Sequence, residues 1–179
     1  MKKEIYDDSQ EIWLEDIMNE YGDRMIRVAY NYLKDWGTAQ ETVQEVFITC
    51  YNHYDQYSNA ENFKALIYRI TINRSKDVLR SSLIKRVIVG TEYFTFHKAK
   101  DPSPEILFIQ SNENAFIAEM VLSLPVKYRE AILLFYYENL SVEESSEMLK
   151  INKNTIKSRL RRGRKLLGNI LEGSDQYEK

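Results

Sequence analysis

The chain has 179 residues, of which 44% are hydrophobic and 29% charged, and its formal net charge is only -2. This composition is typical of a folded, soluble protein with one domain or two small ones, and it excludes an intrinsically disordered chain. No apolar run approaches the roughly 18 residues of a membrane-spanning helix, and the start M-K-K-E-I-Y-D-D lacks the apolar core of a secretory signal. We therefore expect a cytoplasmic protein. A single cysteine excludes an internal disulfide, and with only two scattered histidines beside it no metal-ligand spacing for structural zinc can be assembled.

Helical periodicity dominates the chain, because apolar residues recur mainly three and four positions apart and few glycines or prolines interrupt them. We expect a nearly all-helical (all-α) protein. A first long helix ends near the turn Asp35-Trp36-Gly37. Its outline is given by Ile12, Ile17, Tyr21, Val28 and Tyr32.

A second helix is expected to begin at Thr38, because Thr38 and Glu41 have the spacing of a capping box. One apolar stripe follows from this start. It consists of Val43, Val46, Phe47, Cys50 and Tyr54. Cys50 is therefore interpreted as a core residue.

The third helix follows the polar segment 55–62 and has two different faces. Phe63, Ile67, Ile70 and Val78 are expected on its buried side. The opposite side carries a polar and basic stripe of Arg69, Asn73, Lys76 and Arg80. Residues 1–80 would form one domain, followed by a flexible linker over 81–111, where periodicity fades and D-P-S-P-E resists regular structure.

The second domain, residues 112–179, is expected to contain a helix-turn-helix. A helix near Asn112 to Ser123 is followed by Pro125, which suits the first turn of the next helix. Ser141 and Glu144 form another capping-box pattern, and Asn152 or Asn154 can cap the final helix. In that helix Ile156, Leu160, Gly163 and Leu167 share one side, and Asn154, Ser158, Arg161, Arg162 and Lys165 share the other.

Charge is strongly separated along the chain despite the small net value. Met148 to Leu171 holds eight Lys or Arg and no acid, whereas Met1 to Asn62 holds thirteen acids against five bases. A basic run alone is usually a solvated helix face, but here one run coincides with the second helix of a helix-turn-helix, which typically lies in the DNA major groove. Near the other basic stripe, Tyr54 and Tyr57 flank a polar loop and could stack on unpaired bases, although most neighbouring aromatic residues are better explained as core.

The chain resembles the bacterial extracytoplasmic-function (ECF) sigma factors of the sigma-70 family. The segment T-A-Q-E-T-V-Q-E-V-F, from Thr38 to Phe47, is similar to the family's polymerase-docking helix, and F-K-A-L-I-Y-R-I-T-I-N, from Phe63, to its promoter-melting helix. The segments L-P-V-K-Y-R-E-A-I-L-L-F-Y-Y-E-N-L-S-V-E-E and T-I-K-S-R-L-R-R-G-R-K-L-L resemble its fourth region and recognition helix. Two features depart from the family pattern: Lys150 replaces a usual glycine in the turn, and Ser145-Ser146 replace a large apolar and small pair.

This resemblance implies an alternative sigma factor that binds core RNA polymerase and directs transcription from specific promoters. Polymerase would be bound by Gln40, Glu41, Gln44, Glu45 and Phe47. The minus-ten element would be bound by Tyr57, Asn59, Asn62, Arg69, Asn73, Lys76 and Arg80. The minus-thirty-five element would be read by Asn154, Thr155, Lys157, Ser158, Arg161, Arg162 and Lys165. Promoter DNA and an anti-sigma factor, which is often membrane-anchored, are the further partners that the resemblance implies.

Two other functions remain open from the sequence. A promoter-binding activator would use the helix-turn-helix without polymerase docking, but it leaves the segment from Phe63 to Asn73 unexplained. A helical enzyme acting on nucleic acid would need clustered carboxylates or histidines. The nearest acids, Glu143, Glu144 and Glu147, are more simply explained by their place near a helix N-terminus. His53 and His97 have no evident partner, and neither a catalytic residue, a cofactor nor a nucleotide-binding loop is expected.

Overall fold

The structure is a computed structural model that describes residues 8–89 and 112–174, and every described element is helical. It divides into two compact units, Met1–Glu92 and Tyr93–Lys179. The expected all-α fold is confirmed. Within the described ranges, no helix is both long enough and apolar enough to cross a membrane.

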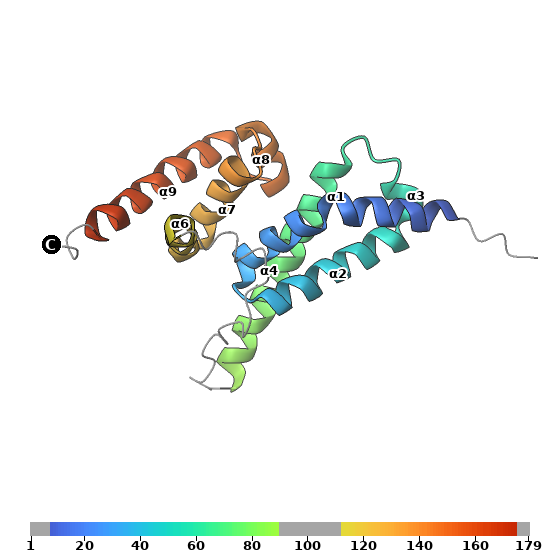
Figure 1. The fold of residues 1–179 in the computed structure, drawn as a ribbon, viewed down its shortest axis with the longest axis horizontal. Helices are drawn as coiled ribbons and strands as arrows, with labels where there is room; N and C mark the ends of the chain where they lie inside the picture. The colour runs from blue at the N-terminus through green and yellow to red at the C-terminus, as the bar shows by residue number, and fades with distance from the viewer. Residues whose placement is uncertain (1–7, 90–111, 175–179) are drawn as a thin grey trace, which may run out of the picture. The chain divides into compact units, whose positions relative to one another are not determined.

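The first unit contains α1 (Asp8–Leu33), α2 (Trp36–Asn52), the short α3 (Tyr54–Tyr57) and α4 (Phe63–Val89). Helices α1, α2 and α4 pack against one another (Figure 1). Their shared core includes Met25, Val28, Val46, Cys50 and Ile67, each nearly or completely inaccessible to solvent. Burial raises the pKa of the Cys50 thiol to about 11, which agrees with its interpretation as a core residue.

The turn between α1 and α2 is tighter than the sequence suggested. Lys34 takes a left-handed backbone conformation with φ of 57°, and α2 begins directly afterwards at Trp36. Asp35 caps the helix, because its Oδ1 accepts hydrogen bonds from the backbone N of Thr38 at 2.8 Å and from Thr38 Oγ1 at 2.7 Å. The capping box expected from Thr38 and Glu41 is therefore wrong: Thr38 lies inside the first turn, where it donates to the real cap.

The third predicted helix corresponds to α4 and continues to Val89, past Ser81, where the linker was expected to begin. No glycine or proline interrupts residues 81–89, and Ser81 and Ser82 bond back to carbonyls of their own helix, so nothing in this stretch ends it. The buried side is also displaced from the predicted one. Ile67, Tyr68, Thr71, Ile72 and Ser75 are buried, whereas Ile70 is only half-buried. The remainder of the expected linker, 90–111, lies outside the described residues.

The second unit contains α6 (Asn112–Ser123), α7 (Val126–Ile132), the π-helical segment η1 (Leu133–Tyr137), α8 (Val142–Leu149) and α9 (Lys153–Ser174). Pro125 is the residue that precedes α7, one position earlier than expected. The core of the unit is formed by Val121, Leu124, Ala131, Ile132, Ile156 and Leu160. Helices α8 and α9, joined by a short turn, make the predicted helix-turn-helix.

Candidate polymerase and nucleic-acid interfaces

The outer face of α2 carries four of the five expected polymerase-binding residues. Gln40, Glu41, Gln44 and Glu45 are all exposed. Phe47 differs, because it is only 7% exposed and belongs to the core of the first unit. A direct contact between the Phe47 ring and a partner does not fit this structure; the ring instead supports α2 from its inner side.

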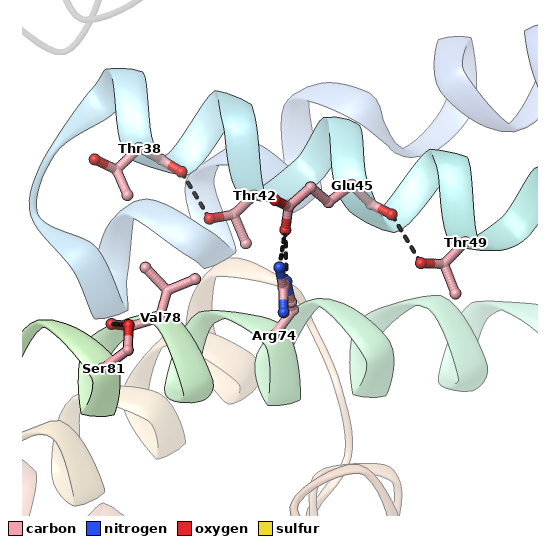
Figure 2. Close-up of polar contacts among 7 residues, drawn as sticks. All are labelled: Thr38, Thr42, Glu45, Thr49, Arg74, Val78 and Ser81. Carbon is pink, nitrogen blue, oxygen red and sulfur yellow. Dashed lines mark hydrogen bonds and ion pairs between the residues drawn. The ribbon is translucent and has the colours of Figure 1, made fainter.

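An ion pair links the α2 face to α4. Glu45 accepts a hydrogen bond from Arg74 Nε, and Arg74 Nη2 pairs with the same carboxylate oxygen (Figure 2). Thr42 and Thr49 lie on the same edge of α2, but their hydroxyls donate to Thr38 O and Glu45 O of their own helix, at 2.7 and 2.8 Å. Neither threonine hydroxyl bonds the Glu45 carboxylate, which pairs with Arg74 instead.

Two apolar residues extend the α2 face and were missed by the sequence reasoning. Ile48 is 60% exposed and lies one turn beyond Gln44, and Tyr51 is 36% exposed and lies about two turns beyond Gln44. A large exposed aliphatic residue beside acidic and amide groups is a composition suited to protein contact. The signal was available, because Ile48 breaks the spacing of the buried stripe Val43, Val46 and Cys50.

The aromatic residues near α3 have different surroundings. Tyr54 packs edge-to-face on Trp13, with ring centroids 5.3 Å apart, and Trp13 also contacts Phe63 at 5.4 Å. Tyr57 instead stacks on His53, with centroids 5.3 Å apart and an interplanar angle of 17°. His53, for which no partner was evident in the sequence, is also fixed by a 2.9 Å contact between its Nδ1 and Thr49 O.

The two asparagines expected at the minus-ten element help to build the loop that holds them. Asn59 Nδ2 donates to Asp55 O at 2.9 Å. Asn62 Oδ1 accepts from the backbone N of Ala65 at 3.0 Å, as an N-terminal cap of α4 does. Both side chains are exposed, so each can reach a ligand only by using its remaining polar atoms.

The expected minus-ten residues of α4 lie away from its buried side. Asn73 and Arg80 are exposed, and Arg69 and Lys76 are half-buried. Arg80 pairs with Asp77 at 3.3 Å, and Lys76 Nζ lies 5.6 Å from the centroid of the Tyr32 ring. The stripe therefore exists as a surface in the structure, although part of its charge is already engaged within the unit.

The helix-turn-helix is fixed by local hydrogen bonds at both ends of α8. The predicted capping box is confirmed: Glu144 N donates to Ser141 Oγ at 3.1 Å, and Ser141 N donates to Glu144 Oε2 at 2.7 Å. At the other end, Lys150 takes the left-handed conformation, with φ of 52°, that a glycine would adopt more readily. The turn thus keeps a glycine-like geometry without a glycine.

The start of α9 is joined to α8 in two ways. Asn152 Oδ1 accepts from Asn154 N at 2.8 Å, which makes Asn152, one of the two candidates, the capping residue. Lys153 Nζ pairs with Glu143 at 3.1 Å, and this hydrogen bond lowers the pKa of the Glu143 carboxyl. Glu143 and Glu144 thus have structural roles in the helix-turn-helix: Glu143 pairs with Lys153, and Glu144 belongs to the capping box.

The outer face of α9 carries the residues expected to read the minus-thirty-five element. Thr155 and Ser158 are half-buried, and the other members of the set are exposed: Asn154, Lys157, Arg161, Arg162 and Lys165. The opposite side contains Ile156, Leu160 and Gly163, all buried. The two-faced helix predicted from the sequence is present.

The remaining arginines of α9 have structural partners. Arg159 Nη1 bonds the buried Glu130 carboxylate of α7 at 2.6 Å, and Arg164 Nη1 donates to Tyr136 Oη at 3.1 Å. Arg162 hydrogen-bonds the Tyr128 hydroxyl, which lowers the pKa of that phenol. Arg159 and Arg164 thus join α9 to α7 and η1, whereas Arg162 both contacts Tyr128 and belongs to the exposed set expected to read DNA.

Close packing of α9 on α7 depends on Gly163. A Cβ atom at this position would lie 3.1 Å from Ile132 Cγ1 and 3.6 Å from Tyr128 Cβ. The first distance is tighter than ordinary van der Waals contact. Gly163 thus allows the approach that sets the position of the basic face.

Comparisons with known proteins agree with this division into two units. The family profile described as Sigma-70 region 2 matches residues 17–82, and the profile described as Sigma-70, region 4 matches residues 117–167. The ECF RNA polymerase sigma factor SigW of Bacillus subtilis is 31% identical over 159 residues, which cover 85% of each chain. The chain belongs to the ECF sigma factors. It is therefore a protein that directs promoter-specific transcription initiation by RNA polymerase, in a family of non-enzymatic regulators.

A further relative and two solved structures extend the comparison. SigE of Mycolicibacterium smegmatis is 30% identical over 157 residues, which span 88% of this sigma factor and 61% of the relative. The sigma factor RpoE, solved with the anti-sigma factor NepR from Bartonella quintana, matches with a TM-score of 0.67 at 21% identity, over 88% of this chain and 98% of RpoE. CnrH, solved with the cytosolic domain of CnrY, gives 0.64 at 18% identity, over 89% and 88% of the two chains. Both structures support the fold.

Proposed function

We propose that three surfaces divide the work of this sigma factor. The outer face of α2 binds core polymerase, the polar stripe of α4 with the α3–α4 loop binds the opened minus-ten element, and the outer face of α9 reads the minus-thirty-five element. The protein itself catalyses no reaction and acts in the cytoplasm, where polymerase and promoter DNA are found.

The observation that carries this proposal is the two-faced structure of α9 within a helix-turn-helix. Ile156 and Leu160 anchor its inner side, while Lys157, Arg161 and Lys165 are exposed on the other. The second helix of such a motif lies in the major groove, where arginine can bond guanine through two hydrogen bonds and lysine can neutralise phosphate.

At the minus-ten element we propose capture of an unpaired base near the α3–α4 loop. Stacking on an aromatic ring contributes roughly 1 to 3 kcal/mol per base, which offsets part of the cost of unpairing. Both rings already have an aromatic neighbour. Tyr57 is better placed for this role, because its neighbour His53 is exposed, whereas Tyr54 packs on Trp13, which also contacts Phe63.

We also propose an anti-sigma factor as a partner of this chain. CnrH and RpoE, which share its fold, were solved with the cytosolic domain of CnrY and with the anti-sigma factor NepR, respectively. A protein that covers the α2 face or the DNA-binding faces would block initiation.

The melting surface can be tested with Asn73→Ala and Lys76→Ala. Asn73 is exposed and Lys76 half-buried on the polar stripe of α4, so we expect the variants to bind core polymerase normally and to form fewer open complexes. Permanganate reactivity of unpaired thymines on a cognate promoter reports the opening directly. A pre-opened template should restore much of the lost transcription.

Thermal unfolding provides the control, because Asn73 is exposed whereas Lys76 lies near the ring of the buried Tyr32. Normal promoter opening by both correctly folded variants would show that this face of α4 does not act in melting.

A further inference from the structure

The ion pair between Glu45 and Arg74 has an uneven geometry. Arg74 Nε and Nη2 both meet the same carboxylate oxygen, Oε2 of Glu45. Within the described part of the chain, the Glu45 carboxylate has no hydrogen-bond or ion-pair partner other than Arg74. The second carboxylate oxygen, Oε1, therefore remains available, and the Glu45 side chain is 50% exposed.

Arg74 approaches Glu45 from α4 (Figure 2). Glu41, Gln44 and Ile48 of α2 are all exposed, and the structure shows no contact of Arg74 with them. The arginine thus fixes the glutamate without occupying the face that the polymerase would cover. A free glutamate side chain loses rotational freedom when it binds a partner, and a side chain that is already fixed loses less.

We propose that Arg74 is a positioning residue for polymerase docking: it holds one oxygen of Glu45 and presents the other to a hydrogen-bond donor on core polymerase. This inference rests on the proposed docking role of the outer α2 face. Arg74 belongs to none of the binding sets expected from the sequence. It lies between the stripe residues Asn73 and Lys76 in the chain, but its side chain bonds Glu45 of α2.

A purely stabilising role is the competing explanation. The Arg74 side chain is 47% exposed, and ion pairs at that exposure contribute little to folding. The two explanations separate in a binding measurement, because only the positioning role makes the effect of Arg74 on polymerase affinity depend on Glu45.

The test uses the full-length protein and core polymerase without DNA, with affinity measured by fluorescence anisotropy. We expect Arg74→Ala to weaken binding about two- to fivefold, the range open to an exposed ion pair. In a Glu45→Gln background, Arg74→Ala should have no further effect. Arg27→Ala is the matched control, since it removes the same charge from an exposed position on α1 and should leave the affinity unchanged.

Two outcomes would overturn the inference. The first is unchanged or tighter polymerase binding by Arg74→Ala. The second is a loss of affinity from Arg74→Ala that is as large in the Glu45→Gln background as in the wild type, which would indicate direct contact between Arg74 and polymerase. Glu41→Ala distinguishes this failure from a failure of the docking surface. If Glu41→Ala weakens polymerase binding and Arg74→Ala does not, only the positioning role of Arg74 is rejected. If Glu41→Ala and Glu45→Gln both bind with full affinity, the docking role of the α2 face is rejected.

Discussion

At the scale of single residues, the helix-turn-helix contains two energetically unfavourable features, at Lys150 and Ser145. Lys150 has a left-handed backbone, which costs a non-glycine residue roughly 1 to 2 kcal/mol. Ser145 is fully buried, and its hydroxyl has no hydrogen-bond partner among the described residues. Both residues are among the departures noted in the sequence analysis, and the helix-turn-helix still forms with them.

Replacing Lys150 by glycine should stabilise the second unit. Glycine adopts φ of 52° without steric cost, while its greater freedom in the unfolded chain offsets part of the gain, so we expect a net increase of about 1 kcal/mol in the free energy of unfolding. Chemical denaturation followed by circular dichroism measures it. Lys157→Gly, in the interior of α9, should instead destabilise by up to about 1 kcal/mol. A lower stability for Lys150→Gly would contradict the assigned strain.

At the scale of elements, α9 combines two tasks that a substitution can separate. Arg161 and Lys165 are both exposed and lie one turn apart on the outer face. If Arg161 bonds a base, Arg161→Ala should cost roughly 1 to 3 kcal/mol and relax the preference at one base pair. If Lys165 holds a phosphate, Lys165→Ala should weaken all sequences alike and reduce the salt dependence by about one phosphate.

Titrations of holoenzyme on matched and singly substituted minus-thirty-five elements, at several salt concentrations, distinguish the two effects. Full discrimination at every base pair by Arg161→Ala would reduce the role of this arginine to phosphate binding.

The sequence predicts the elements of this protein better than their contacts. Helical periodicity identified the long helices but not the short α3 or the π-helical η1, and the Ser141–Glu144 spacing identified one cap correctly. The cap at Thr38 failed because two acceptable capping residues, Asp35 and Thr38, lie close together, and only the backbone conformation selects between them. Partners such as Arg74 for Glu45 and Tyr57 for His53 depend on how helices pack or turn, which periodicity does not specify.

At the scale of the whole molecule, charge is distributed unevenly along the chain. Thirteen acids in Met1–Asn62 suit a basic protein surface, and the eight basic residues of Met148–Leu171 suit DNA. The net charge of -2 conceals this division. Each unit has its own core, so each can hold its binding faces by itself.

Promoter-specific initiation should therefore require this protein and core polymerase together. Polymerase supplies the chemistry, and the sigma factor supplies recognition at two promoter elements, so transcription from a single start site on a cognate promoter should appear only in the mixture. Run-off transcription with each component alone and with both combined measures this requirement. Raising the salt concentration should reduce promoter binding steeply, because phosphate contacts release counterions. Tight, specific duplex binding by the purified protein without polymerase would favour an activator instead, and specific initiation by core polymerase alone would contradict the requirement.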